Sequence, residues 1–386
     1  MIMWIVLAAL QAILAVRVLS RLARSTSGIR ILPAAVPPEG RIAIVIPVLD
    51  ERARLGACLN GVRAQTAEVA EILVVDGGSR DGTPDLVRWH ATLDPRIRLV
   101  DASPVPPAWT GKAWGLAVGL RHVAADVDWV LCLDADVRPA PLLARSLLAH
   151  AERTSVAVLS VATRQRLGND ALALLHPSLL ATIVYRHGAP GGATADASRV
   201  MANGQCFLVR RDVLRRTRAV HAARDSLCED ITIARRLARA GERIGFYEAS
   251  DLVSVQMYRS WREAWEGWPR SLPMRDRYFG WRGAVGLAEV ALVQAAPIPL
   301  AVLSAVVGSV PLLAVNLVLA AVRIGVLVGM ARAYLSPPWT YWLSPLTDLP
   351  VAVRLIESAL RRRHRWRGRR YVRNSLGRFQ LDEGVA

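Results

Sequence analysis

Long apolar runs at both ends of the chain flank a central region of short alternating segments. The first run covers residues 1–19, and four arginines lie between positions 17 and 30, at and after its end. A cleaved signal peptide would carry its positive charge before the apolar run. We therefore expect an uncleaved transmembrane anchor at residues 1–22, with its C-terminal end in the cytosol. A proline-containing linker, residues 32–40, leads into the central region.

The central region, residues 41–250, alternates short β-branched runs with amphipathic helical runs. The expected strands are Ile42–Ile46, Glu71–Val75, Ile97–Val100, Trp129–Leu133 and Ser155–Val161. The expected helices are Leu55–Gln65, Pro84–His90, Lys112–Val123 and Leu142–Ala151. This order predicts an α/β fold in which right-handed βαβ units build a Rossmann-like, mostly parallel sheet. Ligands of such sheets bind beyond the carboxyl ends of the strands.

An aromatic and arginine-rich segment, residues 251–284, follows the predicted sheet. Trp261, Trp265 and Trp268 recur at helical spacing beside Arg and Glu, which favours an amphipathic helix in the headgroup region of a membrane. The alternative is a domain-closing helix packed on the sheet. We favour the membrane interface because apolar runs follow directly.

Residues 285–360 contain two further apolar runs and one interrupted run. Leu287–Val307 and Val310–Met330 each reach the roughly 20 residues that a bilayer requires. Arg323 lies inside the second run and should face a helix neighbour or a cavity, or reach toward the inner surface. Prolines and charges interrupt Trp339–Leu360, so we expect a re-entrant or interfacial segment there. Three spans would place the basic tail, residues 361–386, in the cytosol.

Composition supports a membrane enzyme more than a nucleic-acid-binding protein. The chain has 386 residues, of which 53% are hydrophobic, and a formal net charge of +17 that comes almost entirely from arginine. We find no RNA-binding signature of Arg and aromatic residues, no zinc-ligand spacing and no helix-turn-helix pattern. The apolar runs make the lipid bilayer the expected partner, and no nucleic acid is expected. The four cysteines are scattered and fit small buried positions.

Acidic residues follow three of the predicted strands. Asp50 and Asp76 each come directly after an apolar run, and the run ending at Leu133 is followed by Asp134 and Asp136. Because side chains alternate along a strand, Asp134 and Asp136 can share one side and hold a hard cation against a diphosphate. A bare Asp-x-Asp also occurs in turns and calcium loops, so the pair alone is weak evidence.

Together, four acidic sites in a fixed order resemble the family 2 glycosyltransferases of the GT-A fold. They are Asp50-Glu51 after the first strand, Asp76 in Val75-Asp-Gly-Gly-Ser-Arg-Asp-Gly-Thr83, the Asp134/Asp136 pair, and Glu229-Asp230 before a helical segment. The resemblance covers residues 41–268. The family usually has Asn-Glu where this chain has Asp50-Glu51.

The resemblance implies a role for each site. Asp50 or Glu51, with Asp76, would bind the ribose and base of the nucleotide, although Asp76 could instead cap a turn. Asp134 and Asp136 would hold the sugar diphosphate through Mg²⁺ or Mn²⁺, with Asp136 the more direct ligand. Asp230 would be the general base, oriented by Glu229. The alternative for Asp230 is an acid favoured by a helix N-terminus.

Two further motifs extend the predicted site. Lys112, in Pro106-Pro-Ala-Trp-Thr-Gly-Lys112, is the sole lysine in a chain rich in arginine, which indicates a fitted contact to a phosphate or nucleotide. The segment also resembles the Gly-Lys segment that many family members place beside the donor. The alternative is a surface lysine retained by chance. Gln256-Met-Tyr-Arg259-Ser-Trp261 resembles the Gln-x-x-Arg-Trp signature of membrane synthases, with one extra residue before Trp. By analogy, Arg259 would contact the diphosphate, and Gln256 and Trp261 would contact the acceptor.

The sequence is thus similar to family 2 membrane glycosyltransferases. Two segments, Pro-Pro-Ala-Trp-Thr-Gly-Lys112 and Trp-Arg-Gly-Arg-Arg-Tyr371, also resemble those of hopanoid-associated and carotenoid glycosyltransferases. The expected reaction is inverting transfer of a sugar from a nucleotide-sugar donor, with UDP the expected nucleotide, to a membrane lipid, first of all an isoprenoid. The expected location is the inner membrane, with several spans and a cytosolic catalytic domain. The alternatives are a polysaccharide synthase, for which the chain offers few spanning helices, and a noncatalytic membrane scaffold.

Overall fold

The core of the molecule is an eight-stranded, mostly parallel sheet, as the alternating pattern predicted. The computed structural model describes residues 2–25, 28–366, 368–375 and 377–382. The strand order is β3-β2-β1-β4-β9-β6-β10-β8, in which β3, β2, β1 and β4 are parallel and β9 and β8 run antiparallel to their neighbours. The strands are β1 Ile42–Val48, β2 Val69–Asp76, β3 Ile97–Asp101, β4 Trp129–Leu133, β6 Val158–Ala162, β8 Gly192–Thr194, β9 Cys206–Arg210 and β10 Ile244–Glu248.

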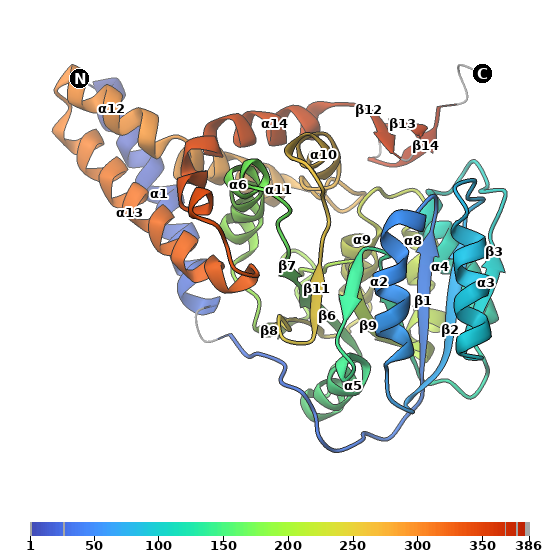
Figure 1. Cartoon of the computed structure of the whole chain (residues 1–386). Helices are drawn as coiled ribbons and strands as arrows, with labels where there is room; N and C mark the ends of the chain where they lie inside the picture. Colours follow the sequence, from blue (N-terminus) through green and yellow to red (C-terminus); the bar gives the residue numbers. More distant parts are fainter. Residues whose placement is uncertain (1, 26–27, 367, 376, 383–386) are drawn as a thin grey trace.

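Helices cover both faces of this sheet and bury its side chains in two hydrophobic clusters (Figure 1). One face is covered by α2 Arg52–Arg63, α3 Thr83–Leu93 and α5 Leu143–Thr154. The other is covered by α4 Gly111–His122, α7 Arg211–Thr217, α8 Ala219–Ala222 and α9 Glu229–Arg239. Strand β1 reads Ile-Ala-Ile-Val-Ile-Pro-Val and is buried along almost its whole length, as expected of a parallel strand covered on both faces.

A second, three-stranded sheet begins where β4 ends. Its strands are β5 Val137–Pro139, β11 Val253–Val255 and β7 Arg164–Gln165, in the order β5-β11-β7. Strand β5 pairs antiparallel with β11, and β11 pairs parallel with β7. Asp134 and Asp136 therefore lie in a short connection that is fixed at both ends by paired strands.

The apolar helices pack together beside the α/β domain (Figure 1). Among the described residues, two helices are long and apolar enough to cross a membrane: α1 Ile2–Ser25 and α13 Val310–Met330 with its continuation to Ala333. A third candidate is a bent pair, Trp281–Ala295 and Pro297–Val307, whose parts differ in direction by 58°. The apolar run Leu287–Val307 is thus not one straight helix. Pro297 lacks a backbone N–H and cannot continue the preceding hydrogen-bond pattern.

The bent pair consists of α11 Trp281–Glu289, a π-helical turn at Val290–Ala295 and α12 Pro297–Val307. The other helices of this region are α6 Asp170–His187, α10 Trp261–Gly267 and α14 Asp348–Leu360, with 3₁₀ segments at Trp268–Arg270, Ala331–Ala333 and Trp339–Thr347. In the tryptophan-rich segment, Trp261 is 47% exposed whereas Trp268 is buried against His176 and Tyr258. One end of this segment therefore packs into the protein while the other remains exposed.

Polar pairs hold α1 against the other apolar helices. Gln11 and Asn316 are fully buried and exchange two side-chain hydrogen bonds, at 3.0 and 3.1 Å, between α1 and α13. Arg17 and Arg21 both form ion pairs with the buried Glu289 carboxylate, each at 2.9 Å. Such groups are costly in an apolar environment unless they are paired. Helix α1 is therefore an integral part of the helical bundle.

Arg323 in α13 faces a helix neighbour, which was one of the three arrangements expected. Its Nε and Nη2 atoms lie 2.6 and 3.1 Å from the two carboxylate oxygens of Asp348, at the start of α14, and both side chains are almost fully buried. Removing one partner would leave the other charge buried and unpaired. We therefore expect Arg323→Ala to lower the free energy of unfolding by about 3–5 kcal/mol, measured by thermal or denaturant unfolding in detergent.

Arg361→Ala is the matched control for this prediction. Arg361 also pairs with a carboxylate, that of Glu357, but the two side chains are 51% and 43% exposed. Exposed pairs contribute about 0–1 kcal/mol. Equal losses of stability in the two variants would contradict a structural role for the buried pair.

The C-terminal basic segment forms a small antiparallel sheet. Its strands are β12 Arg363–Trp366, β13 Arg369–Arg373 and β14 Phe379–Leu381. Tyr371 and Phe379 are buried against Leu227, just before helix α9, and the backbone N–H of Phe379 donates to the carbonyl of Asp225 at 2.8 Å. Part of the segment expected as a basic tail is therefore folded onto the α/β domain.

Candidate active site

Lys112 is the centre of the charged cluster at the carboxyl edge of the sheet. Its Nζ lies 2.7 Å from Asp134 Oδ1 and 2.8 Å from Glu229 Oε1. Although burial disfavours its ammonium form, the carboxylates of Asp134 and Glu229 hold the pKa of Lys112 well above its ordinary value. Lys112 thus joins the end of β4 to the start of α9, two sites that the sequence places almost a hundred residues apart.

Close packing of α4 on β1 determines where Lys112 lies. A side chain at Gly119 would begin 2.5 Å from Val45 Cγ1, and one at Gly115 would begin 3.0 Å from Pro47 Cβ. Only glycine permits this approach of helix to strand. The first turn of α4, which carries Lys112, is therefore held directly beside the ends of the central strands.

Asp136 is an incompletely satisfied carboxylate facing the same region. Its Oδ1 atom is buried and has no hydrogen-bond partner among the residues that the structure describes. Burial, together with the nearby charges of Asp134 and Glu51, raises the pKa of Asp136 to about 7. A buried carboxylate without compensation is costly, and a bound cation would relieve that cost.

Asp230 is held at the first turn of α9 by two backbone donors. The N–H of Gly204 donates to Asp230 Oδ2 at 2.7 Å, and the N–H of Ile231 donates to Oδ1 at 2.8 Å. Burial and the adjacent Glu229 carboxylate raise the pKa of Asp230 to about 6. This value places Asp230 in the range where a carboxylate is ionised at neutral pH yet basic enough to accept a proton.

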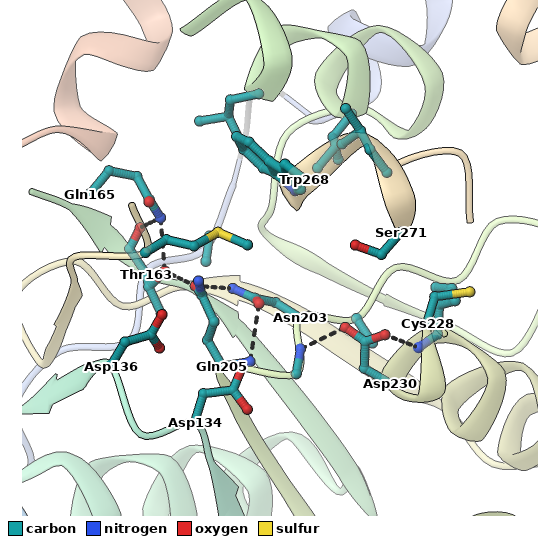
Figure 2. Close-up of a pocket in the computed structure, with 18 of the residues that line it drawn as sticks. Asp134, Asp136, Thr163, Gln165, Asn203, Gln205, Cys228, Asp230, Trp268 and Ser271 are labelled. Carbon is teal, nitrogen blue, oxygen red and sulfur yellow. Dashed lines mark hydrogen bonds between the residues drawn. The ribbon is translucent and has the colours of Figure 1, made fainter. Parts of the chain in front are cut away.

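The loop of Asn203, Gly204 and Gln205, which sequence reasoning missed, supports both carboxylate sites (Figure 2). Gly204 binds Asp230, the carbonyl of Gln205 accepts from the N–H of Asp134 at 3.2 Å, and Thr163 donates to the Gln205 side chain at 2.6 Å. The signal in the sequence is an Asn-Gly turn directly before an apolar strand. That signal predicts a turn but not which carboxylates the turn will contact.

Asp50 and Asp76 lie in the turns next to this cluster. Asp76 accepts hydrogen bonds from the backbone N–H groups of Gly78 and Ser79, at 3.2 and 3.0 Å, and Asp50 Oδ1 accepts from the N–H of Arg80 at 2.8 Å. Asp76 therefore caps a turn, the alternative considered from the sequence. Glu51, by contrast, lines the cavity described below.

The Gln-x-x-Arg-Ser-Trp motif begins beside the cluster, since the backbone N–H of Gln256 donates to the carbonyl of Asp136 at 3.5 Å. The side chains of Gln256 and Arg259 contact other groups. Gln256 accepts from Arg138 at 3.1 Å, the exposed Arg259 donates to the carbonyl of Ala53 at 2.8 Å, and Trp261 is half exposed. None of the three motif residues Gln256, Arg259 and Trp261 lines the cavity, and their substrate contacts stay predictions. Residues of this part of the chain that do line it include Met257, Tyr258, Trp268 and Arg270.

One cavity of about 1030 Å³ connects the charged cluster with the apolar helices. At one end it is lined by Glu51, Lys112, Asp134, Asp136, Glu229 and Asp230. At the other it is lined by apolar residues of α6 and by Val322, Gly325, Val326 and Gly329 of α13. Figure 2 shows Asp134, Asp136 and Asp230 around its polar part, with Trp268 and Ser271 on the opposite side.

The protein side chains alone do not form a complete metal site. Among the described residues, no group of three or more His, Cys, Asp or Glu side chains is placed to hold a metal ion. Magnesium and manganese sites in phosphate-transfer and sugar-transfer chemistry need few protein ligands, because phosphate oxygens and water supply the rest. Asp136, with its unpartnered oxygen, fits such a site.

An α/β domain with a mostly parallel sheet and carboxylates at its carboxyl edge is the architecture of the GT-A glycosyltransferases. The mannosyltransferase PcManGT from Pyrobaculum calidifontis, solved in complex with GDP-Man and Mn²⁺, has this fold. It superposes with a TM-score of 0.54 at 20% sequence identity, over 91% of this chain and 99% of PcManGT. Residues 43–218 match the family described as Glycosyl transferase family 2. The α/β domain of this chain is therefore similar to family 2 glycosyltransferases.

Relatives of known sequence fall in the same class. The succinoglycan biosynthesis protein ExoA of Rhizobium meliloti is 26% identical over 304 residues, which cover 76% of this chain and 87% of ExoA. The undecaprenyl-phosphate 4-deoxy-4-formamido-L-arabinose transferase of Aeromonas hydrophila is 31% identical over 105 residues, 26% of this chain and 30% of that protein. These likenesses support a glycosyltransferase.

Proposed function

We propose that the protein transfers a sugar, with inversion, from a nucleotide-sugar donor to a membrane lipid at the cytosolic face of the inner membrane. The single observation that carries this proposal is the continuous cavity between the carboxylate cluster and helix α13. A water-soluble donor would enter at the polar end. A lipid acceptor would keep its apolar chain beside α13 and place its polar head near Asp230.

The donor would bind at the polar end, with UDP as the expected nucleotide. Glu51 and the turns that contain Asp50 and Asp76 would contact the nucleoside, and Asp136 and Asp134 would hold Mg²⁺ or Mn²⁺ with the diphosphate. When bound, the metal would offset the charge that develops on the departing nucleoside diphosphate. The raised pKa of Asp136 supports this assignment, because a cation would relieve the repulsion among Asp136, Asp134 and Glu51.

Asp230 would be the general base of the reaction. It would accept the proton of the acceptor hydroxyl or acid as that oxygen attacks the anomeric carbon. The N–H groups of Gly204 and Ile231 fix the orientation of its carboxylate, and the Glu229 carboxylate forms an ion pair with Lys112. Lys112 would thus position the two acidic sites relative to each other, in addition to the phosphate contact expected from the sequence.

An isoprenoid is the acceptor that we propose first. The cavity wall on α13 is apolar and carries two glycines, Gly325 and Gly329, at which a Cβ atom would meet no other atom within 4 Å. Open space beside two glycines one helical turn apart leaves room for a flexible hydrocarbon chain. Ceramide-like and glycerolipid acceptors are the next candidates.

A larger side chain in the space beside Gly325 should impair sugar transfer without affecting binding of the nucleotide donor. We expect Gly325→Leu to lower transfer of labelled sugar to a membrane lipid extract by roughly tenfold, while affinity for a nucleoside diphosphate with Mn²⁺ stays unchanged. Val328→Leu, at an exposed position of the same helix, is the control and should transfer normally. Unchanged transfer by the Gly325→Leu variant would contradict the proposal that the lipid acceptor binds beside α13.

A polysaccharide synthase is the second candidate, favoured by the similarity to ExoA, whose name assigns it to succinoglycan biosynthesis. A synthase that also exported its polymer would need a closed path through the membrane, whereas the described residues include two to three candidate spans. A noncatalytic scaffold would need none of the acids. Full lipid glycosylation in cells that carry Asp136→Ala or Asp230→Ala would favour the scaffold.

A further inference from the structure

The C-terminal sheet brings an arginine into the cavity. Trp366, Arg369 and Tyr371 of this sheet all line the same cavity as the carboxylate cluster. Tyr371 and Phe379 are buried against Leu227, and the backbone N–H of Phe379 donates to the carbonyl of Asp225 at 2.8 Å. The sheet is therefore fixed to the segment that leads directly into Glu229 and Asp230.

Arg369 carries a buried donor that has no partner. Its Nη1 atom is inaccessible to solvent and makes no hydrogen bond with any residue in the described part of the chain. The same atom lies against the start of helix α4, since a Cβ atom built on Gly111 would be 3.4 Å from it. Burying a charged donor without a partner is costly, so an unpartnered donor on a residue that lines a cavity points to a group that binds there.

The surroundings of Arg369 favour an anion. The guanidinium adjoins the N-terminal turn of α4, whose backbone N–H groups carry partial positive charge, and Lys112 is the next residue after Gly111. The carboxylates of Asp134 and Glu229 are already paired with Lys112. A phosphate group suits this position, because a planar guanidinium can donate two parallel hydrogen bonds to it.

We propose that Arg369 binds a phosphate group of a substrate in the cavity, so that the C-terminal sheet is part of the active site. The inference rests on the proposed function. The phosphate can have two sources: the diphosphate of the nucleotide donor, or a phosphate head of the lipid acceptor.

The test compares Arg369→Gln with Arg370→Gln in the full-length protein in nanodiscs. Arg370 is the exposed neighbour on the same strand, where side chains alternate between faces, so it controls for the loss of one charge. The probes are UDP and GDP, each with Mn²⁺, and a long-chain isoprenyl phosphate, with the isoprenyl alcohol as its uncharged control. Thermal unfolding of each variant verifies the fold, and Arg369→Lys should recover part of the binding.

We expect Arg369→Gln to weaken binding of at least one phosphate probe by about tenfold or more, and Arg370→Gln to weaken binding of none. Weaker nucleotide binding would assign Arg369 to the donor, and weaker binding of the isoprenyl phosphate alone would assign it to the acceptor. If Arg369→Gln binds every probe as the wild type does, the inference is wrong while the proposed function stands. If the wild type itself binds neither nucleotide with Mn²⁺, the proposed function and this inference both fail.

Discussion

Replacing Asp230 by Asn should reduce sugar transfer by about 10²- to 10⁴-fold while leaving nucleotide binding unchanged. Asn keeps the size of the side chain and can still accept a hydrogen bond from Gly204 or Ile231, but it cannot accept the acceptor's proton. The measurement is the transfer of label from a nucleotide sugar to the chloroform-soluble fraction of membranes that contain each variant. Affinity for the nucleoside diphosphate with Mn²⁺ is measured in parallel.

The pH dependence gives this prediction an independent check. Because the pKa of Asp230 is raised to about 6, the base is ionised above that pH and protonated below it. Wild-type transfer should therefore fall by about tenfold between pH 7 and pH 5, whereas the residual rate of Asp230→Asn should lack this step. Asp85→Asn, at an exposed position on α3, is the control. Near-normal transfer by Asp230→Asn would exclude Asp230 as the base.

Replacing Asp136 by Asn should weaken Mn²⁺-dependent binding of a nucleoside diphosphate by about 100-fold, or ~2.7 kcal/mol. Binding without metal should change little, because the carboxylate is proposed to act through the cation. Titration calorimetry with and without Mn²⁺ measures both quantities. Equal affinities of wild type and Asp136→Asn in the presence of Mn²⁺ would contradict a metal site at Asp136.

The same substitution should stabilise the protein in the absence of ligands. The folded-state pKa of Asp136, about 7, lies above its ordinary value of 3.8, so the folded state holds the proton more tightly than the unfolded state does. Stability from this group is thus present at low pH and is lost as pH rises through about 7. Asp136→Asn removes that loss, and its unfolding temperature should exceed that of the wild type at pH 8 but not at pH 4.

Much of the catalytic domain could be predicted from the sequence because its signals are local. Buried parallel strands form continuous apolar runs, and the runs ending near Ile46, Val75 and Leu133 all became strands of the main sheet. Carboxylates directly after such runs must lie at one edge of the sheet. The placement of Asp134, Asp136 and Glu51 on one cavity follows from that rule.

The remaining contacts depend on packing that no local pattern encodes. Strand β12 alternates exposed and half-buried positions, so its arginines resemble a solvated tail, and only Tyr371 and Phe379 reveal the buried face of the small sheet. The helical spacing of its tryptophans predicted a helix in residues 251–284. It did not predict that Trp268 would face the cavity while Trp261 remains exposed. The ion pairs of Lys112 join segments that are distant in the chain.

The product itself tests the central claim most directly. Lipid extracts of cells that produce the wild-type protein, the Asp230→Asn variant or no protein would be compared by mass spectrometry. The cavity that links the carboxylates to α13 predicts a lipid whose mass is increased by one sugar residue, present only with the wild type. Identical lipids in all three extracts, with the transferred sugar found instead in a water-soluble or polymeric product, would contradict transfer to a membrane lipid.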